Sequence, residues 1–414
     1  MIRRFSLFFA FKTLFSRSGS GAIRHIRGAI IGAAISIIPL VVVLEISDGM
    51  IHGIVDRYME ISSFHMQVTL ADSEAVEKED ELLEKIRNIG GVTYAFPYTQ
   101  GGGILYGEKG RTGITVRGIP DTLFKEDEGF SRYITVKEGE FDLSEPDSLI
   151  ISTETAQRLK AGVGDEIKLL TAKVVPGRPM LLRPTRFTIK GIYSSGYQEL
   201  DMLSAFITQE YGEKLFKEDS SRMIGVKVAA PHTGELFAIA DEIRYLSDGI
   251  RVATWDVLND SLVASLNTTK KFLVFIMILI MGVASVNISS SMIMMVISKR
   301  QDIALLKSAG ASDSDVSSIF VLTGLFIGIC AAALGTAFGI AAAININEIV
   351  DFISAVLHFD LFDADYYLEK IPVELSLYKL SASAALAVLF AVVASWLPAR
   401  RAGRINPVEI FRKH

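Results

Sequence analysis

Long apolar runs occur at four places in the chain, and each is long enough to cross a bilayer as a helix. About 20 consecutive apolar residues span the roughly 30 Å hydrocarbon core. The runs cover residues 28–46, 272–297, 316–344 and 380–397. A long, more polar stretch separates the first run from the second. The pattern predicts transmembrane helices 1 to 4 with one large soluble insertion.

The insertion, residues 47–271, alternates short β patterns with amphipathic helical patterns. Residues 65–70 alternate polar and apolar side chains as a strand does, and residues 77–89 have helical spacing. Residues 148–170 predict a strand, a helix and a second strand in succession. The predicted fold class is therefore a membrane protein with four transmembrane α-helices and a large α+β periplasmic domain of two lobes inserted between helices 1 and 2.

Charged residues beside the apolar runs predict the orientation. Cytoplasmic flanks of membrane spans carry an excess of Lys and Arg. The connection 345–379 is rich in Asp and Glu and holds only two lysines. Basic residues gather before the first run and after the fourth: Arg3, Arg4, Lys12, Arg17, Arg24 and Arg27, then Arg400, Arg401, Arg404, Arg412 and Lys413. Both termini are predicted to be cytoplasmic, with the insertion and the loop 345–379 in the periplasm.

The remaining segments are predicted to lie on the cytoplasmic side. They are the N-terminus, residues 1–27, the connection 298–315 and the tail 398–414. An aromatic segment at residues 5–15 is too short to span, and its basic surroundings favour a helix lying in the interface. A disordered leader is the alternative for that segment. The 27 residues before the first run are too many for the leading region of a signal peptide, which favours an uncleaved anchor.

The chain lacks the residue patterns of common catalytic and metal sites. Its one cysteine, Cys330, lies in an apolar run, which excludes a disulfide framework. The patterns GxxxxGK[ST], HExxH and GxSxG do not occur. The middles of the four runs hold no Asp, Glu, Lys or Arg, which ion-coupled carriers place there. We therefore expect no catalytic residue, metal site or cofactor in this chain, and a source of energy outside it.

A proline-containing loop, residues 171–184, joins two predicted strands. Pro176, Pro179 and Pro184 limit its freedom, and apolar residues such as Met180 stand where solvent is expected. A stiff apolar loop loses little entropy when it binds a partner. The loop is predicted to be a docking device, with an ordinary hairpin loop folded onto its own domain as the alternative.

Small residues recur at helical spacing in the third run. Gly324 and Gly328 form one small-xxx-small pair, and Gly335 and Gly339 form another. Such pairs let helix backbones approach closely. We expect packing within the bundle, in preference to a contact specific to a dimer.

Two motifs on the cytoplasmic side resemble those of a known family. The connection SKRQDIALLKSAGAS, residues 298–312, is similar to the segment R-x-E-I-x-[IL]-L-[RK]-[AS]-x-G-A-S of FtsX-type permeases in the MacB-like ABC transporter superfamily. The ending LPARRAGRINPVEIFR, residues 397–412, resembles the family's closing motif. Asp302 stands where the family usually has Glu. Within the superfamily the whole chain most resembles the lipoprotein-releasing subunits of the LolC/LolE type, through its opening residues 8–17, the segment 256–262 and the four-helix layout.

The resemblance implies a transmembrane subunit of an ABC transporter in the bacterial inner membrane. Its implied partners are a dimer of separate ATPase subunits that bind ATP and Mg²⁺, a second permease subunit (identical or related), lipoprotein substrates, membrane lipid and a periplasmic carrier, and no nucleic acid. Contact with the ATPase is implied for Arg300, Asp302, Ile303, Leu305, Leu306, Lys307 and Gly310. Docking of the carrier is implied for Pro176, Gly177, Arg178, Pro179, Met180, Arg183 and Arg186.

Other functions remain open at this point. A MacB-like efflux or secretion permease would share the motifs and the layout. A cell-division type regulator of wall hydrolases would share the membrane part, but those proteins usually have a much smaller outer domain. A membrane-anchored enzyme is disfavoured by the missing catalytic patterns.

Overall fold

The computed structural model describes residues 20–412 except Asp72, Lys109, 174–180, 217–221, 230–233 and 358–370. The predicted interfacial helix at residues 5–15 lies outside this range. The chain divides into two compact units. A helical unit comprises Met1–Met50, Leu266–Phe359 and Ile371–His414. A sheet unit comprises Ile51–Ser265 with Asp360–Lys370.

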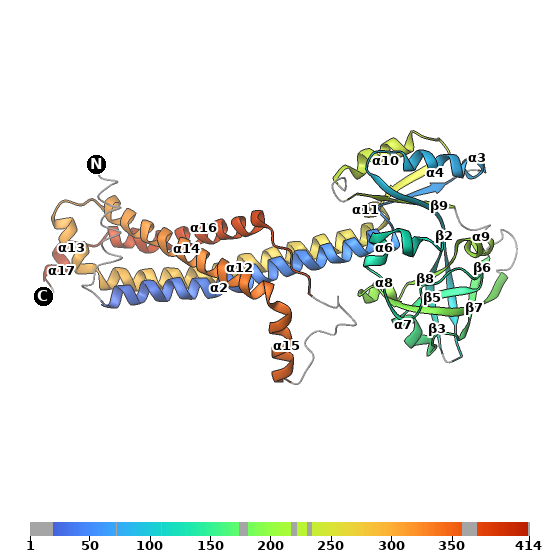
Figure 1. The fold of residues 1–414 in the computed structure, drawn as a ribbon. Helices are drawn as coiled ribbons and strands as arrows, with labels where there is room; N and C mark the ends of the chain where they lie inside the picture. The colour runs from blue at the N-terminus through green and yellow to red at the C-terminus, as the bar shows by residue number, and fades with distance from the viewer. Residues whose placement is uncertain are drawn as a thin grey trace. The chain divides into compact units, whose positions relative to one another are not determined.

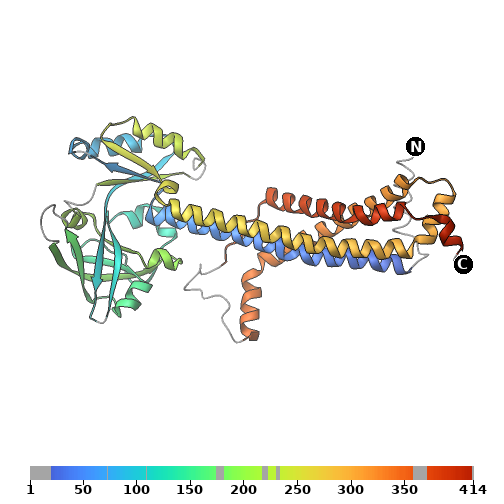
Figure 2. The same ribbon diagram turned by 180° about the vertical axis from the view of Figure 1, so that it is seen from behind.

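Four helices among the described residues are long and apolar enough to cross a membrane. They are α2 (Ser20–Arg57), α12 (Asp260–Ser298), α14 (Asp313–Ile344) and α16 (Leu377–Gly403) (Figures 1 and 2). Each includes one of the four apolar runs and continues beyond it at one end or at both ends. The predicted number and order of spans are confirmed.

Glycines bring the helices of the bundle close together. A Cβ at Gly328 would lie 2.7 Å from the Cβ of Ala391 in α16, and one at Gly335 would lie 2.6 Å from the Cβ of Ile37 in α2. Real Cβ atoms do not approach so closely, so only glycine allows these crossings. The first half of α14 thus packs on α16 and the second half on α2. The prediction that the glycine pairs serve packing within the bundle is confirmed for the described chain.

Among its described residues the helical unit also contains three short helices: α13 (Arg300–Ser308), α15 (Ile346–Leu357) and α17 (Pro407–Arg412). Gly310, with φ of +100°, follows α13 and supplies the left-handed conformation that commonly ends a helix. The next helix, α14, begins with a capping box: the side chain of Ser312 accepts from Asp315 N at 3.2 Å, and Asp315 Oδ2 accepts from Ser312 N at 3.1 Å. This short turn separates α13 from α14.

The sheet unit contains a mixed ten-stranded sheet. Its order is β10-β1-β9-β2-β3-β8-β5-β7-β4, with β6 pairing β2 and β7. The strands are β1 (Met66–Leu70), β2 (Val92–Tyr106), β3 (Arg111–Ile119), β4 (Thr135–Gly139), β5 (Ser148–Ser152), β6 (Glu166–Lys173), β7 (Leu181–Ser194), β8 (Ser204–Thr208), β9 (Met223–Val228) and β10 (Ile250–Thr254). The helices are α3 (Ser73–Glu77), α4 (Glu79–Arg87), α5 (Leu123–Glu126), α6 (Glu128–Arg132), α7 (Thr153–Leu159), α8 (Gln198–Asp201), α9 (Gln209–Phe216), α10 (Leu236–Arg244) and α11 (Trp255–Leu258).

Strand β2 runs through both lobes of this unit (Figure 1). Its first part, to Tyr98, pairs with β9, and its second part, from Thr99, pairs with β3. The first lobe packs α4 and α10 on β10, β1 and β9 around a core that includes Met66, Val226 and Ile243. The second lobe has its own aliphatic and aromatic cores. The predicted α+β domain of two lobes is confirmed.

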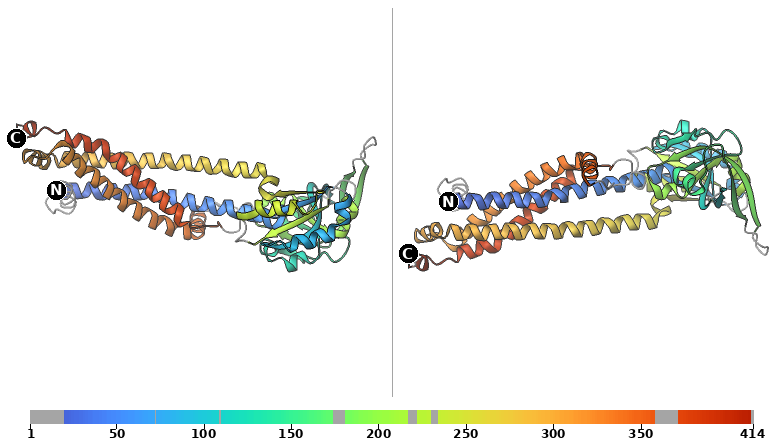
Figure 3. Two further views of the ribbon diagram at one scale, coloured as in Figure 1. Left: turned by 90° about the horizontal axis from the view of Figure 1, so that it is seen from above. Right: turned by 90° about the horizontal axis from the view of Figure 1, so that it is seen from below.

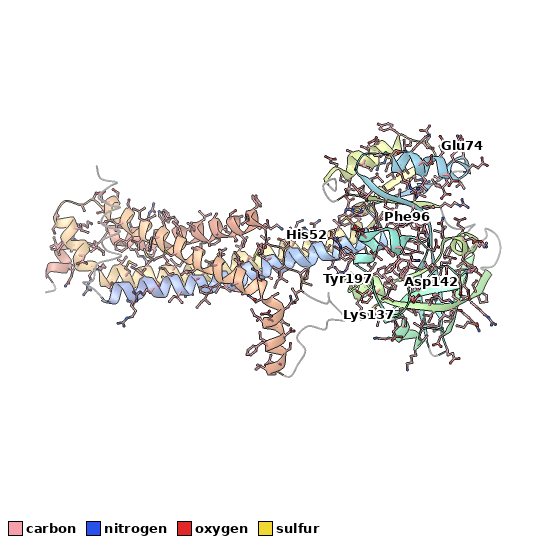
Figure 4. The ribbon with its side chains drawn as sticks, in the orientation of Figure 1. His52, Glu74, Phe96, Lys137, Asp142 and Tyr197 are labelled. Atoms are coloured by element: carbon pink, nitrogen blue, oxygen red, sulfur yellow. The ribbon has the colours of Figure 1, made fainter. Side chains whose placement is uncertain are left out.

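The junction of the lobes holds buried rings and charges. Phe96 of β2, which Figure 4 labels, packs edge-on against Phe64, with ring centroids 4.8 Å apart. Lys227 of β9 pairs with Glu60 at 2.6 Å and with Asp127, the N-cap of α6. Glu60 belongs to a π-helical turn, Tyr58–Ser62, that continues α2. The end of α2 is therefore tied to both lobes.

Candidate functional site

The helix α13 carries the residues for which the family resemblance implies contact with the ATPase, except Gly310, which follows it. Ile303 is only 2% exposed and packs with Val316 and other members of the bundle core, so this side chain faces inward. Asp302 and Leu305 point away from the bundle, and Leu305 is 59% exposed. Arg300 is also exposed and Leu306 is partly buried. An exposed leucine beside an acidic residue is suited to docking in an apolar groove with a basic rim.

Lys307 joins α13 to the rest of the bundle. Its Nζ donates to the carbonyl oxygens of Gly403 at 2.7 Å and Ile405 at 3.0 Å, and pairs with Asp313 at 2.7 Å. Cations favour the carbonyl end of a helix, here the end of α16. Lys307 and Ile303 thus hold α13 in place, and the ATPase contact implied for the residues of this helix stays a prediction.

A second exposed apolar residue lies next to this helix. The helix α17 packs beside α13 (Figure 1), and its Val408 is 70% exposed. Val408 was not among the residues predicted from the sequence, although it lies within the closing motif. The end surface, as we name it, consists of Arg300, Asp302, Leu305 and Val408.

The predicted docking loop lies mostly outside the described residues. This applies to Pro176, Gly177, Arg178, Pro179 and Met180. The strands on either side pair in antiparallel register, with Lys173 opposite Leu181, so β6 and β7 form a hairpin. In β7 the backbone of Arg183 pairs with that of Thr171.

The remaining docking residue, Arg186, is an exposed member of β7. Its Nη1 lies 3.2 Å from Glu166 Oε1 of β6. An exposed pair of this kind contributes about 1 kcal/mol or less, so Arg186 can exchange this carboxylate for another at small cost. The docking role of the hairpin stays a prediction.

Comparisons with known families cover both halves of the chain. Residues 28–244 match the MacB-like periplasmic core domain, and residues 274–407 match the FtsX-like permease C-terminal region. The chain belongs to the FtsX/MacB-type ABC transporter permeases. The predicted membership and its periplasmic domain are confirmed.

Relatives of this permease match most of its length. It is 26% identical over 389 residues to the lipoprotein-releasing system transmembrane protein LolC of Xylella fastidiosa (strain 9a5c), covering 93% of this chain and 92% of that protein. LolC of Neisseria meningitidis serogroup B is 25% identical over 394 residues, with 93% of each chain covered. LolE of Haemophilus influenzae is 24% identical over 305 residues, covering 70% of this chain and 68% of LolE. The resemblance to the LolC/LolE type is confirmed.

Proposed function

We propose that this permease extracts lipoproteins from the bacterial inner membrane and passes them to a periplasmic carrier, driven by ATP hydrolysis in a separate subunit. The observation that carries the proposal is the likeness to LolC, which covers 93% of this chain and 92% of the relative. A match limited to the membrane helices would support a permease of any kind. A match that includes the outer domain supports the same task, because that domain is the part that meets a periplasmic partner.

The end surface supports a mechanical connection to the ATPase. We propose that Asp302 and Leu305 lie in a groove of that subunit. Ile303 and Lys307 fasten α13 to the bundle, so that movement of the ATPase also moves α14 and α16. The bounds of α2 and α12 include residues of both units. These two continuous helices are the direct covalent routes by which motion reaches the sheet unit.

The proposal places both termini in the cytoplasm and the sheet unit in the periplasm. Basic residues at the start of α2 and the end of α16 support this orientation, since such residues are retained on the cytoplasmic side. The complex also holds a second permease subunit, identical or related, and both ATP and Mg²⁺ are bound by the ATPase dimer.

Carrier docking is assigned to the hairpin between β6 and β7, with Arg183 and Arg186 beside it. Deleting Gly177–Leu181 is expected to abolish capture of the carrier in a pull-down and to leave co-purification of the ATPase unchanged. A variant that replaces Glu108, which follows β2, is the control on the same domain. Undiminished capture after the deletion would place carrier docking elsewhere.

Reconstitution tests the proposal as a whole. The chain, its ATPase and its second permease are placed in vesicles that contain a triacylated lipoprotein, with or without the soluble carrier. We expect lipoprotein to appear on the carrier only when ATP and all subunits are present, and no ATP hydrolysis by the chain alone. Active ATP hydrolysis without release, together with binding of a periplasmic adaptor, would favour a MacB-like efflux or secretion permease.

A further inference from the structure

The helix α15 presents an uncovered apolar face. Its sequence is INEIVDFISAVL, and none of its residues is buried. Phe352 is 70% exposed, and Ile353 and Val356 are also exposed. At 3.6 residues per turn Ile353 and Val356 share one side of the helix with Ile349, Asp351 lies on the other side, and Phe352 lies at the border next to Glu348. Such an amphipathic helix is stable when its apolar face contacts an apolar environment and its acidic face contacts water.

The direction of α15 identifies that neighbour. A single residue, Asn345, separates α15 from the membrane-spanning helix α14. The helix α15 turns aside and runs crosswise to the long helices in two different views (Figures 1 and 3). Since the long helices cross the bilayer, a helix crosswise to them lies along its surface.

Side-chain contacts place the start of α15 at the polar border of the bundle. The side chain of Asn347 makes two hydrogen bonds to the backbone of Ile371: its Oδ1 accepts from Ile371 N at 2.9 Å and its Nδ2 donates to Ile371 O at 3.3 Å. The residues that follow contact α2, because a Cβ at Gly49 would clash with the carbonyl oxygen of Pro372, and Ser376 N donates to Glu45 Oε2 at 3.2 Å.

Ion pairs mark the depth of this border. Asp48 of α2 pairs with Lys270 of α12 at 3.1 Å and with Lys379 of α16 at 2.7 Å. Charged side chains are costly within hydrocarbon and gather where helices leave it. Asp48 is next to Gly49, which contacts Pro372, and the neighbouring Ile371 is hydrogen-bonded to Asn347. The first turn of α15 therefore lies close to the depth of these ion pairs.

We propose that α15 lies in the headgroup region at this end of the bundle, with Ile349, Ile353 and Val356 among the acyl chains of the lipid. Burial of apolar area drives the contact, because α15 carries acidic residues and no basic residue that would attract anionic headgroups. This contact keeps the end of α14 at a fixed depth in the bilayer. The hydrogen bonds of Asn347 to Ile371 fix the position of the segment before α16 in the same way. The inference requires only that the chain spans a membrane.

Tryptophan fluorescence in brominated lipid tests this placement. Ile353 and Ala355 are two residues apart, which places their side chains about 200° apart around the helix. In full-length protein carrying Trp255→Phe and Trp396→Phe, single variants Ile353→Trp and Ala355→Trp are compared in vesicles with acyl chains brominated or not. We expect quenching on the order of threefold stronger for Ile353→Trp, and a ratio insensitive to salt and to the fraction of anionic lipid.

Each other outcome overturns the proposal. Equal quenching at the two positions would mean that the helix is surrounded by lipid or by water on all sides. A blue-shifted but unquenched Ile353→Trp would mean that protein covers the face. Cysteines at the same two positions, in a Cys330→Ser background, give an independent readout: a membrane-impermeant maleimide should label position 355 faster than position 353.

Discussion

Lys307 Nζ lies 2.7 Å from the carbonyl oxygen of Gly403, and this contact joins α13 to the end of α16 across 96 positions of the sequence. The same ammonium group reaches Ile405 O and Asp313. Lys307 therefore links α13 to the rest of the bundle, although the motif alone would suggest an exposed charge. Its role, in the function proposed here, is to make α13 move together with the bundle.

Replacing Lys307 by Met should loosen α13 and lower stability. Hydrogen bonds to a charged group contribute about 1–3 kcal/mol, so we expect a loss of that order for the helical unit. Arg300→Met removes the same charge from an exposed position of the same helix and should change stability by about 0.5 kcal/mol or less. Thermal unfolding of the two variants in detergent is the measurement. Equal stability of the two variants would show that the contacts of Lys307 contribute nothing to the stability of the helical unit.

Leu305→Asp should uncouple ATP hydrolysis from transport and leave membrane insertion intact. A carboxylate cannot replace the apolar contact that Leu305 offers at the end surface, and loss of an interface anchor costs about 2 kcal/mol or more of binding. Asp302→Lys should act in the same direction through charge reversal. Leu305→Met keeps the apolar contact and is the control. The measurement is lipoprotein released per ATP hydrolysed; a normal ratio in Leu305→Asp would remove α13 from the coupling path.

Gly335→Ala should destabilise the bundle, whereas Gly282→Ala should not. The new Cβ at Gly335 would lie 2.6 Å from the Cβ of Ile37, and nothing lies within 4 Å of one at Gly282. Overpacking costs about 1–3 kcal/mol, which exceeds the gain of about 1 kcal/mol from replacing glycine in a helix. Thermal stability of the full chain separates the two variants. If both behave alike, α14 does not pack on α2 through this face.

Asp201 should make the sheet unit less stable as pH rises. Burial raises the pKa of this carboxyl from its ordinary 3.8 to about 7, with Glu154 adding to the rise and hydrogen bonds from Ser195 and Ser194 opposing it. The folded chain therefore keeps a proton that the unfolded chain releases above pH 4. This stabilisation is complete below the unfolded pKa and is lost progressively until the pH passes about 7.

The variant Asp201→Asn isolates this effect, because its side chain has no proton to lose. Across the window from about pH 4 to 7, the stability of wild type relative to Asp201→Asn should fall by about 1.4 kcal/mol per pH unit. Hydrogen exchange of the β-sheet amides in the full-length chain measures it, after correction for intrinsic exchange rates. A pH-independent difference would show that Asp201 is ionised throughout this range.

Features that depend on local pattern could be predicted from the amino-acid sequence. Apolar runs of sufficient length predict spans because the bilayer sets one thickness for all of them. The glycine spacing in 324–339 predicts close packing, and the motif at 298–312 predicts a short helix with a family role. Helix α15 was missed, because its residues fall in an acidic connection that we interpreted only by its charge.

The contact partners of individual side chains, in contrast, became known only from the folded chain. Helical spacing cannot show that Ile303 and Lys307 face the bundle while Leu305 faces outward, since all three lie within one short helix and the answer depends on α14 and α16. The same holds for Asp48, whose two lysines are 222 and 331 positions away in the chain. Such contacts form between segments that the sequence separates widely, and periodicity along one segment carries no information about the other.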